Sequence, residues 1–129
     1  EAFSVLPDAA GMNNHMGSAI MEDARSLSAV MEVLKGKGVP FVDSMTTAKS
    51  LGKAVAAEKG VALLERDVFL DSTDSVAVVK DNLRKAGEIA LEKGAAIAIG
   101  HRRRKNYGTG NQRGCAGAGA GRHYLCDRQ

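Results

Sequence analysis

Hydrophobic positions along the chain alternate between short continuous runs and helical stripes. Four apolar runs, at residues 9–12, 39–42, 61–64 and 95–99, have the length and composition of strands. Between the runs, apolar residues recur three or four positions apart, as on one face of a helix. These stripes are Leu27, Val30, Met31 and Leu34; then Ala48, Leu51 and Val55; then Val79, Leu83, Ala86 and Ala90. Glycine follows each stripe, so we expect helices to end at Gly36 and Gly38, at Gly60 and at Gly94.

The order of elements, βαβαβαβ, predicts an α/β fold in which helical crossovers connect the strands of a parallel sheet. Residues 95–99 are all apolar, which predicts a strand buried on both faces. The pattern fits half of a (β/α) barrel and equally a small doubly wound sheet. It does not decide between these two architectures.

Composition changes sharply after His101. Residues 102–129 contain seven of the 18 Lys and Arg residues but only one of the 15 acidic residues, and Leu125 is their only large aliphatic residue. Such a segment cannot bury enough apolar surface to offset the conformational entropy of its chain. We therefore divide the chain into a folded domain, residues 1–101, and a basic, glycine-rich, disordered tail, residues 102–129.

The abrupt loss of periodicity suggests that the tail arises from a frameshift. Synonymous codons can be chosen so that removing one nucleotide after the His101 codon changes the tail into an Ala- and Glu-rich helical pattern followed by a β-branched strand. That is the next unit a barrel requires. The alternative is a genuine basic tail. On the frameshift hypothesis, Cys115 and Cys126 have no zinc or disulfide role.

Several function classes find little support in the sequence. No apolar run approaches the roughly 18 residues of a membrane-spanning helix, so we expect no membrane span. Neither a phosphate-binding loop nor a dinucleotide fingerprint is present. The basic run 102–105 could contact nucleic acid, but it is interleaved with few aromatic residues, and we expect no nucleic-acid partner.

Polar side chains follow each predicted strand. They are Asn13, Asn14 and His15 after the first strand, Asp43 and Ser44 after the second, Arg66, Asp67 and Asp71 after the third, and His101 after the fourth. Chemistry in parallel α/β folds gathers at the carboxyl ends of the strands. We therefore predict that Asn14, His15, Asp43 and His101 line one cleft.

Each of these residues also has a simpler interpretation. Asn and Asp are common in turns and at helix N-termini, and we expect Asp71 to cap the helix that begins near Ser75. A single histidine at a strand end is more often packed than catalytic. Imidazole and carboxylate together suit a zinc-like cation and equally a general acid–base pair.

Four segments resemble the divergent polysaccharide deacetylase family: GMNNHMGS (11–18), FVDSMTT (41–47), RDVFLD (66–71) and AIAIGH (96–101). They occur in the order and at about the spacing of that family. The resemblance implies a NodB-like distorted (β/α) barrel of carbohydrate esterase type. It also implies a carbohydrate or peptidoglycan deacetylase that uses a divalent metal, usually zinc, to activate water.

The resemblance assigns roles to individual residues by position. Catalytic roles fall to His101, as general acid, and to Asp43. From their places after the predicted strands, we also predict substrate binding by Asn13, Asn14, Ser44 and Asp67, and a metal contact by His15. The implied ligand is a glycan.

The family's Asp-Asp strand and a second histidine segment are expected upstream of Glu1, so this chain would supply only part of a metal site. The alternative to an enzyme is a non-catalytic cell-envelope protein that binds glycan on the same fold. Because family members usually carry an export signal, we expect the complete protein in the periplasm or cell envelope.

Overall fold

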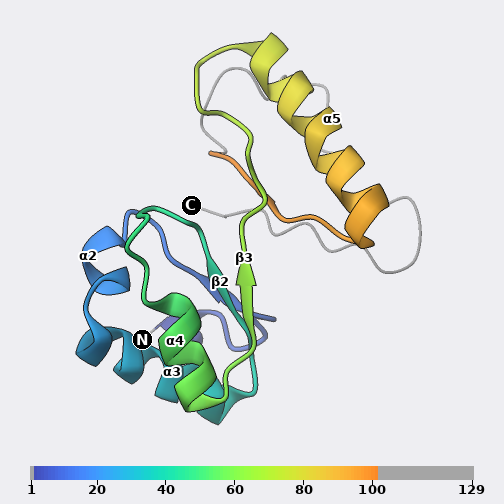
Figure 1. Cartoon of the computed structure of the whole chain (residues 1–129). Helices are drawn as coiled ribbons and strands as arrows, with labels where there is room; N and C mark the ends of the chain where they lie inside the picture. Colours follow the sequence, from blue (N-terminus) through green and yellow to red (C-terminus); the bar gives the residue numbers. More distant parts are fainter. Residues whose placement is uncertain (1, 102–129) are drawn as a thin grey trace. The chain divides into compact units, whose positions relative to one another are not determined.

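Parallel strands with helical crossovers form the structure, as the sequence predicts (Figure 1). The computed structural model describes residues 2–101. These residues divide into two compact units, one up to Glu65 and one from Arg66. Each unit contains its own parallel sheet and its own helical cover.

The first unit is built on a three-stranded parallel sheet in the order β1-β2-β3. Its elements are α1 (Ala2–Val5), β1 (Met12–Asn13), α2 (Ser18–Met21), α3 (Ala24–Lys37), β2 (Phe41–Asp43), α4 (Gly52–Lys59) and β3 (Leu63–Glu65). In the register of the sheet, Met12 pairs with Phe41, and Phe41 pairs with Leu63. The carboxyl ends of β1 and β2 therefore lie next to each other.

The core of the first unit lies between its helices and β2. Helices α3 and α4 pack against each other, and α4 packs against β3 (Figure 1). The buried apolar side chains are Met21, Leu27, Met31, Leu34, Phe41, Val55, Ala56 and Val61. Leu27, Met31 and Leu34 of the first predicted stripe and Val55 of the second face this core, and their burial supplies the main driving force for folding. Ala48, however, lies outside α4 and is exposed, so its place in the second stripe is wrong.

Glycine ends the helices as expected, with one correction. Gly38 and Gly60 adopt left-handed conformations with φ of 68° and 69°, which glycine takes without steric cost. Gly36, however, lies inside α3, so the prediction that it ends the helix is wrong. At the other end of α3, the Asp23 side chain accepts a hydrogen bond from the Ser26 amide. This N-cap was not predicted.

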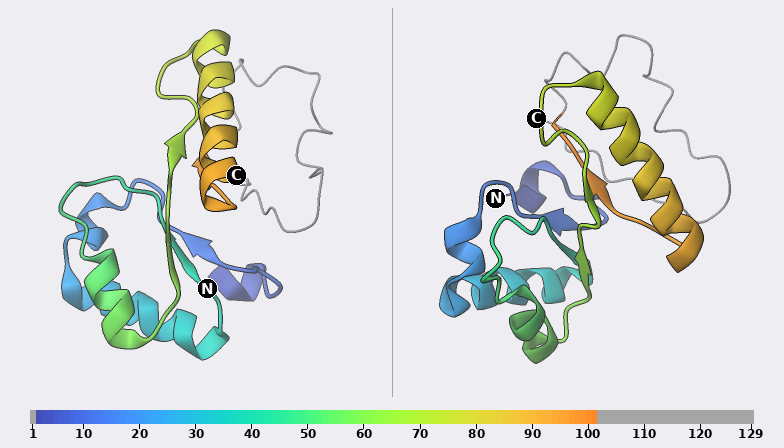
Figure 2. Two further views of the ribbon diagram at one scale, coloured as in Figure 1. Left: turned by 45° about the vertical axis from the view of Figure 1, so that its right-hand side comes forward. Right: turned by 45° about the horizontal axis from the view of Figure 1, so that its top comes forward.

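The second unit pairs two short parallel strands beside a long helix (Figure 2). Its elements are β4 (Val68–Phe69), α5 (Val76–Lys93) and β5 (Ala98–Ile99). Val79 and Ala86 of α5 are buried, and the Asn82 amide donates hydrogen bonds to the carbonyl oxygens of Phe69 and Leu70. These bonds attach α5 to the end of β4.

Three expectations from the hydrophobic pattern need correction. Ala98 and Ile99 are only half-buried, so the expected full burial of this strand is wrong. Leu83 is exposed although it belongs to the predicted stripe. Strand β4 and the short helices α1 and α2 were not predicted, and the strands begin two or three residues later than the apolar runs.

Within residues 2–101, no helix is both long and apolar enough to cross a membrane. The predictions for residues 102–129, including the frameshift and the roles of Cys115 and Cys126, lie outside the described residues.

Candidate functional site

Asn14 joins the loops that follow β1 and β2. Its side-chain oxygen accepts a hydrogen bond of 2.7 Å from the Ser44 amide, and its nitrogen donates to the Thr46 hydroxyl at 3.1 Å. Asn13 donates to the Ser44 hydroxyl at 3.3 Å. Both ends of the Asn14 amide are therefore engaged, and the side chain is nearly buried. Three of the four predicted substrate-binding residues thus lie together at this edge.

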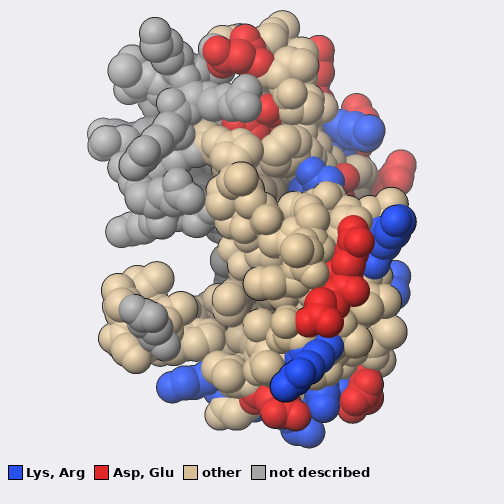
Figure 3. Space-filling view, turned by 90° about the vertical axis from the view of Figure 1, so that its left-hand side faces the viewer, with Lys and Arg blue, Asp and Glu red and all other residues tan. Residues whose placement is uncertain are grey.

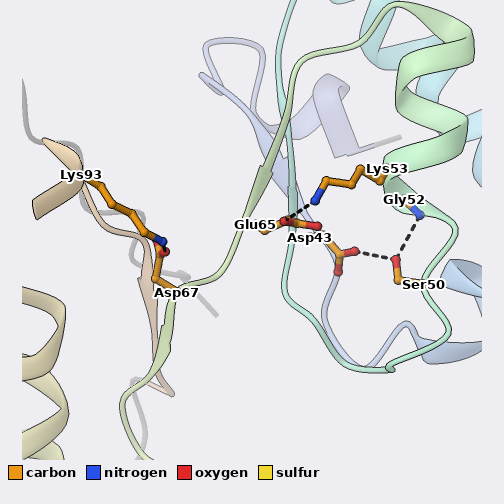
Figure 4. Close-up of polar contacts among 7 residues, drawn as sticks. All are labelled: Asp43, Ser50, Gly52, Lys53, Glu65, Asp67 and Lys93. Carbon is orange, nitrogen blue, oxygen red and sulfur yellow. Dashed lines mark hydrogen bonds and ion pairs between the residues drawn. The ribbon is translucent and has the colours of Figure 1, made fainter. Parts of the chain in front are cut away.

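Asp43 is buried at the end of β2, and both of its carboxylate oxygens accept hydrogen bonds. Figure 4 shows the bond to Ser50. The Met45 amide donates to one oxygen at 2.8 Å, and the Ser50 hydroxyl donates to the other at 2.6 Å. Ser50 in turn accepts from the Gly52 amide at 3.0 Å. Asp43 therefore connects the end of β2 to the start of α4. The catalytic role predicted for Asp43 stays a prediction, because these contacts are those of a positioning group.

His15 is the second residue after β1 and is exposed to solvent. It lies between Asn14, which is fixed to the loop after β2, and Met16, which has a positive φ of 51°. The sequence placed His15 at the carboxyl edge of the sheet, and the structure confirms that position. A metal contact for His15 stays a prediction.

In the second unit, a buried Asp71 pairs with a partly exposed His101 just beyond the carboxyl ends of β4 and β5. The Asp71 carboxylate accepts a 2.9 Å hydrogen bond from the His101 amide and lies 3.1 Å from the imidazole Nδ1. The Asp71 side chain is 1% exposed, whereas that of His101 is 43% exposed. Asp71 is thus buried inside the unit, whereas part of the His101 imidazole reaches the surface.

The expected capping role of Asp71 is wrong. Ser75 occupies the N-cap position of α5, four residues further along the chain, and its side chain makes no cap hydrogen bond. Asp71 instead faces a residue from the next strand. A carboxylate buried this deeply needs strong hydrogen-bond donors, and His101 supplies two of them.

Phe69 packs beside the imidazole of His101. The two ring centroids are 5.7 Å apart with an interplanar angle of 83°, an edge-to-face contact. The Arg66 guanidinium lies over the same Phe69 ring, 4.9 Å from its centroid. The imidazole is therefore held by Asp71 through its hydrogen bonds and by Phe69 through packing.

Asp67 lies at the opposite end of this sheet from His101, just before β4 begins. Its carboxylate accepts a 2.9 Å hydrogen bond from the Ile97 amide and another of 2.9 Å from the Lys93 ammonium, the second of which Figure 4 shows. These two contacts hold the pKa of Asp67 below its ordinary value, the Ile97 amide having the larger effect. The hydrogen bond to Ile97 connects the residue before β4 to the residue before β5. Substrate binding by Asp67 stays a prediction.

Replacing Asp67 with asparagine is expected to lower the melting temperature of the full-length protein at pH 7. The free energy of unfolding should fall by about 1–2 kcal/mol, because an amide replaces a carboxylate that accepts two hydrogen bonds. The pKa of Asp67 is lower in the folded state, so its ionised form stabilises the fold above about pH 4. This contribution disappears as the pH falls through the folded-state pKa. Thermal unfolding of wild type and Asp67→Asn should therefore differ at pH 7, and the difference should shrink as the pH falls below about 4. An equal difference at neutral and at acidic pH would contradict this role.

Charges of both signs are mixed on the surface of the described residues. Figure 3 shows acidic and basic side chains next to one another on one face. Exposed ion pairs join Lys53 to Glu65 and Lys59 to Glu32, each at 3.2 Å. The hydrogen bond to Glu32 raises the pKa of Lys59. Exposed pairs of this kind add little stability, and we assign them no role in the site.

The described residues do not form a complete metal site. No group of three or more His, Cys, Asp or Glu side chains within residues 2–101 could hold a metal together. Both oxygens of Asp43 are already engaged by protein donors.

Apart from Asp67, the predicted site residues fall into two groups. Asn13, Asn14, His15, Asp43 and Ser44 gather at the carboxyl ends of β1 and β2. His101 lies at the carboxyl end of β5 with Asp71. The prediction that both groups line one cleft stays a prediction.

Sequence reasoning missed several residues that shape the two groups. Thr46 and Ser50 bind Asn14 and Asp43, and Phe69 contacts His101. The sequence did contain one indication that Asp71 is not a helix cap. An N-cap residue directly precedes its helix, and Asp71 lies too far from Ser75 to cap that helix.

Comparison with known proteins identifies the family. The family model described as divergent polysaccharide deacetylase matches residues 1–109. The chain belongs to the divergent polysaccharide deacetylase family. The resemblance of its four motifs is thereby confirmed, and the parallel α/β units are consistent with part of the NodB-like fold.

Two relatives of this divergent polysaccharide deacetylase chain are bacterial proteins. An uncharacterized protein of Haemophilus influenzae is 42% identical over 102 residues, which cover 79% of this chain and 36% of the relative. The uncharacterized protein YibQ of Escherichia coli is 34% identical over 100 residues, covering 78% of this chain and 31% of YibQ. The chain thus spans about a third of the length of these curated relatives.

A solved structure has a similar fold. The crystal structure of an uncharacterized protein from Agrobacterium tumefaciens matches with a TM-score of 0.66 and 26% sequence identity. The match covers 70% of this chain and 37% of the Agrobacterium protein.

Proposed function

We propose that this chain is part of a hydrolase that removes acetyl groups from an N-acetylated glycan in the cell envelope. The observation that carries the proposal is the Asp71–His101 pair. It places a partly exposed imidazole at a strand end, backed by a buried carboxylate. Membership of the divergent polysaccharide deacetylase family supports the substrate class.

His101 is proposed as the general acid. Because an ionised carboxylate only accepts hydrogen bonds, Asp71 favours the tautomer that carries its hydrogen on Nδ1. In that arrangement Nε2 is the ring nitrogen that exchanges protons with the substrate. The negative charge of Asp71 also stabilises the imidazolium form, which is the proton donor.

The proposed reaction is hydrolysis of an amide bond. Water adds to the acetyl carbonyl carbon and releases one proton to solvent, and the C–N bond then breaks. His101 gives its Nε2 proton to the departing amine and is reprotonated from solvent. The products are acetate and the free amino sugar. In the first unit, Asn14 and Asp43 position the loops after β1 and β2 through their hydrogen bonds.

Release of acetate tests this proposal. The full-length protein is incubated with an N-acetylglucosamine oligomer and, separately, with peptidoglycan, each with and without a chelator. We expect acetate from at least one of the two substrates. Loss of release with chelator, and its recovery with zinc, would support dependence on a divalent metal. Binding of the oligomer without any acetate release would contradict the enzyme and favour a glycan-binding protein.

A further inference from the structure

Asn82 places a polar side chain on the face of α5 that packs against β4. It lies three residues after Val79 and four before Ala86, so these three side chains share one face of the helix. Val79 and Ala86 are buried, and Asn82 is half-buried. Apolar residues usually occupy such a face. An amide among them needs hydrogen-bond partners within the unit.

The Asn82 amide binds two consecutive backbone carbonyl groups. Its nitrogen donates to the carbonyl oxygens of Phe69 and Leu70, each at 3.0 Å. A side-chain amide carries two N–H hydrogens, so each carbonyl oxygen can accept one of them. The backbone is thereby fixed to α5 immediately before Asp71.

The hydrogen-bond ladder between β4 and β5 changes partners at Leu70. The Leu70 amide donates to the Ile99 carbonyl oxygen at 2.8 Å, and in a parallel ladder of this register the next bond would join the His101 amide to the Leu70 carbonyl oxygen. At this point the His101 amide donates to the Asp71 carboxylate at 2.9 Å. The Leu70 carbonyl oxygen accepts from Asn82. Asn82 therefore occupies an acceptor that would otherwise compete with Asp71 for the His101 amide.

The other carbonyl group that Asn82 binds belongs to Phe69. The Phe69 ring contacts the His101 imidazole edge to face, with the ring centroids 5.7 Å apart. The carboxylate of Asp71, two residues further along the chain, lies 3.1 Å from the imidazole Nδ1. Asn82 thus holds the backbone that carries both of these contacts of the imidazole.

We propose that Asn82 is a positioning residue for His101 and acts through Asp71 and Phe69. The inference rests on the proposed function, in which His101 is the general acid. Without Asn82, the Leu70 carbonyl oxygen would compete for the His101 amide. The Asp71 carboxylate would then lose a donor, and the imidazole would shift. A displacement of about 1 Å at a catalytic group can lower the rate roughly 100-fold.

Asn82→Ala in the full-length protein tests this inference. We expect kcat for acetate release from an N-acetylglucosamine tetramer to fall about 10- to 100-fold with KM within about twofold, because the change acts on the general acid. In an Asp71→Asn background, the same change should lower kcat by less than about threefold, since the pair on which Asn82 acts is already broken. Asn82→Ser keeps one donor hydrogen and should have an intermediate kcat. If Asn82→Ala does not fold, Asn82→Ser is measured in its place.

Val79→Ala is the matched control. Val79 is buried on the same face of α5, so this variant loses packing and keeps the hydrogen bonds of Asn82. Its melting temperature should fall, and its kcat, measured well below that temperature, should stay near the wild-type value. An equal loss of kcat in Val79→Ala and Asn82→Ala would overturn the inference, because loss of helix packing would explain both.

A measurement that needs no turnover separates this inference from the proposed function. Nitrogen-15 chemical shifts of the neutral His101 imidazole, assigned with His101→Ala, report which ring nitrogen carries the hydrogen. We expect the hydrogen on Nδ1 in the wild-type protein and a shift toward the Nε2 form in Asn82→Ala. Wild-type imidazole signals in Asn82→Ala would overturn the inference. Absence of acetate release by the wild-type protein would overturn the proposed function, and the imidazole signals would still decide whether Asn82 positions His101.

Discussion

Replacing Asp71 with asparagine is expected to lower kcat for acetate release by roughly 10²- to 10⁴-fold, with little change in KM. The buried carboxylate accepts hydrogen bonds from both the amide and the imidazole of His101. An amide at this position carries no charge to stabilise the imidazolium. Its NH₂ group can also bind Nδ1 as a donor, which favours the wrong tautomer of His101.

The matched control for this variant is Asp81→Asn. Asp81 lies on α5, its side chain is 69% exposed, and it pairs with Arg84 at 2.6 Å. The same chemical change at this exposed position should leave kcat unchanged. Wild-type kcat in Asp71→Asn, measured with the N-acetylglucosamine tetramer, would contradict the role assigned to Asp71.

Replacing Asp43 with alanine is expected to destabilise the first unit by about 3 kcal/mol, because two hydrogen-bond donors lose their acceptor. The site is also tightly packed, since a Cβ added at Gly52 would lie 2.9 Å from the Asp43 carboxylate. The melting temperature should fall, and hydrogen exchange at the Met45 amide should accelerate.

Asp81→Ala is the control for this effect, because an exposed ion pair contributes little to stability. A double variant, Asp43→Ala with Ser50→Ala, should be less destabilised than the sum of the two single variants, since each removes the same hydrogen bond. Unchanged stability and exchange in Asp43→Ala would rule out the positioning role.

The sequence predicted those parts of the fold that depend on local interactions. Helix α4 ends at Gly60 as expected, because a left-handed glycine after an apolar stripe is a local signal. Strand limits were less predictable. Strand β1 contains only Met12 and Asn13, since its extent depends on pairing with β2, which lies far away in the sequence.

The positions of Asn14 and Asp43 were predictable from the sequence, but the hydrogen bonds that the site residues form were not. Parallel strands bring their carboxyl ends to one edge, and this rule correctly located Asn14 and Asp43. The pairing of Asp71 with His101 spans 30 residues, and the hydrogen bond between Asn14 and the Ser44 amide also spans 30. Such long-range contacts depend on strand register, which the hydrophobic pattern does not determine. For that reason Asp71 was mistaken for a helix cap.

Paired measurement of turnover and binding in His101→Ala tests the central claim most directly. Acetate release from the N-acetylglucosamine tetramer and the Kd for the same tetramer are measured in the full-length wild-type protein and in the variant. If His101 is the general acid, acetate release should be abolished, while the Kd stays within about threefold of wild type. Acetate release at the wild-type rate by His101→Ala would contradict the account.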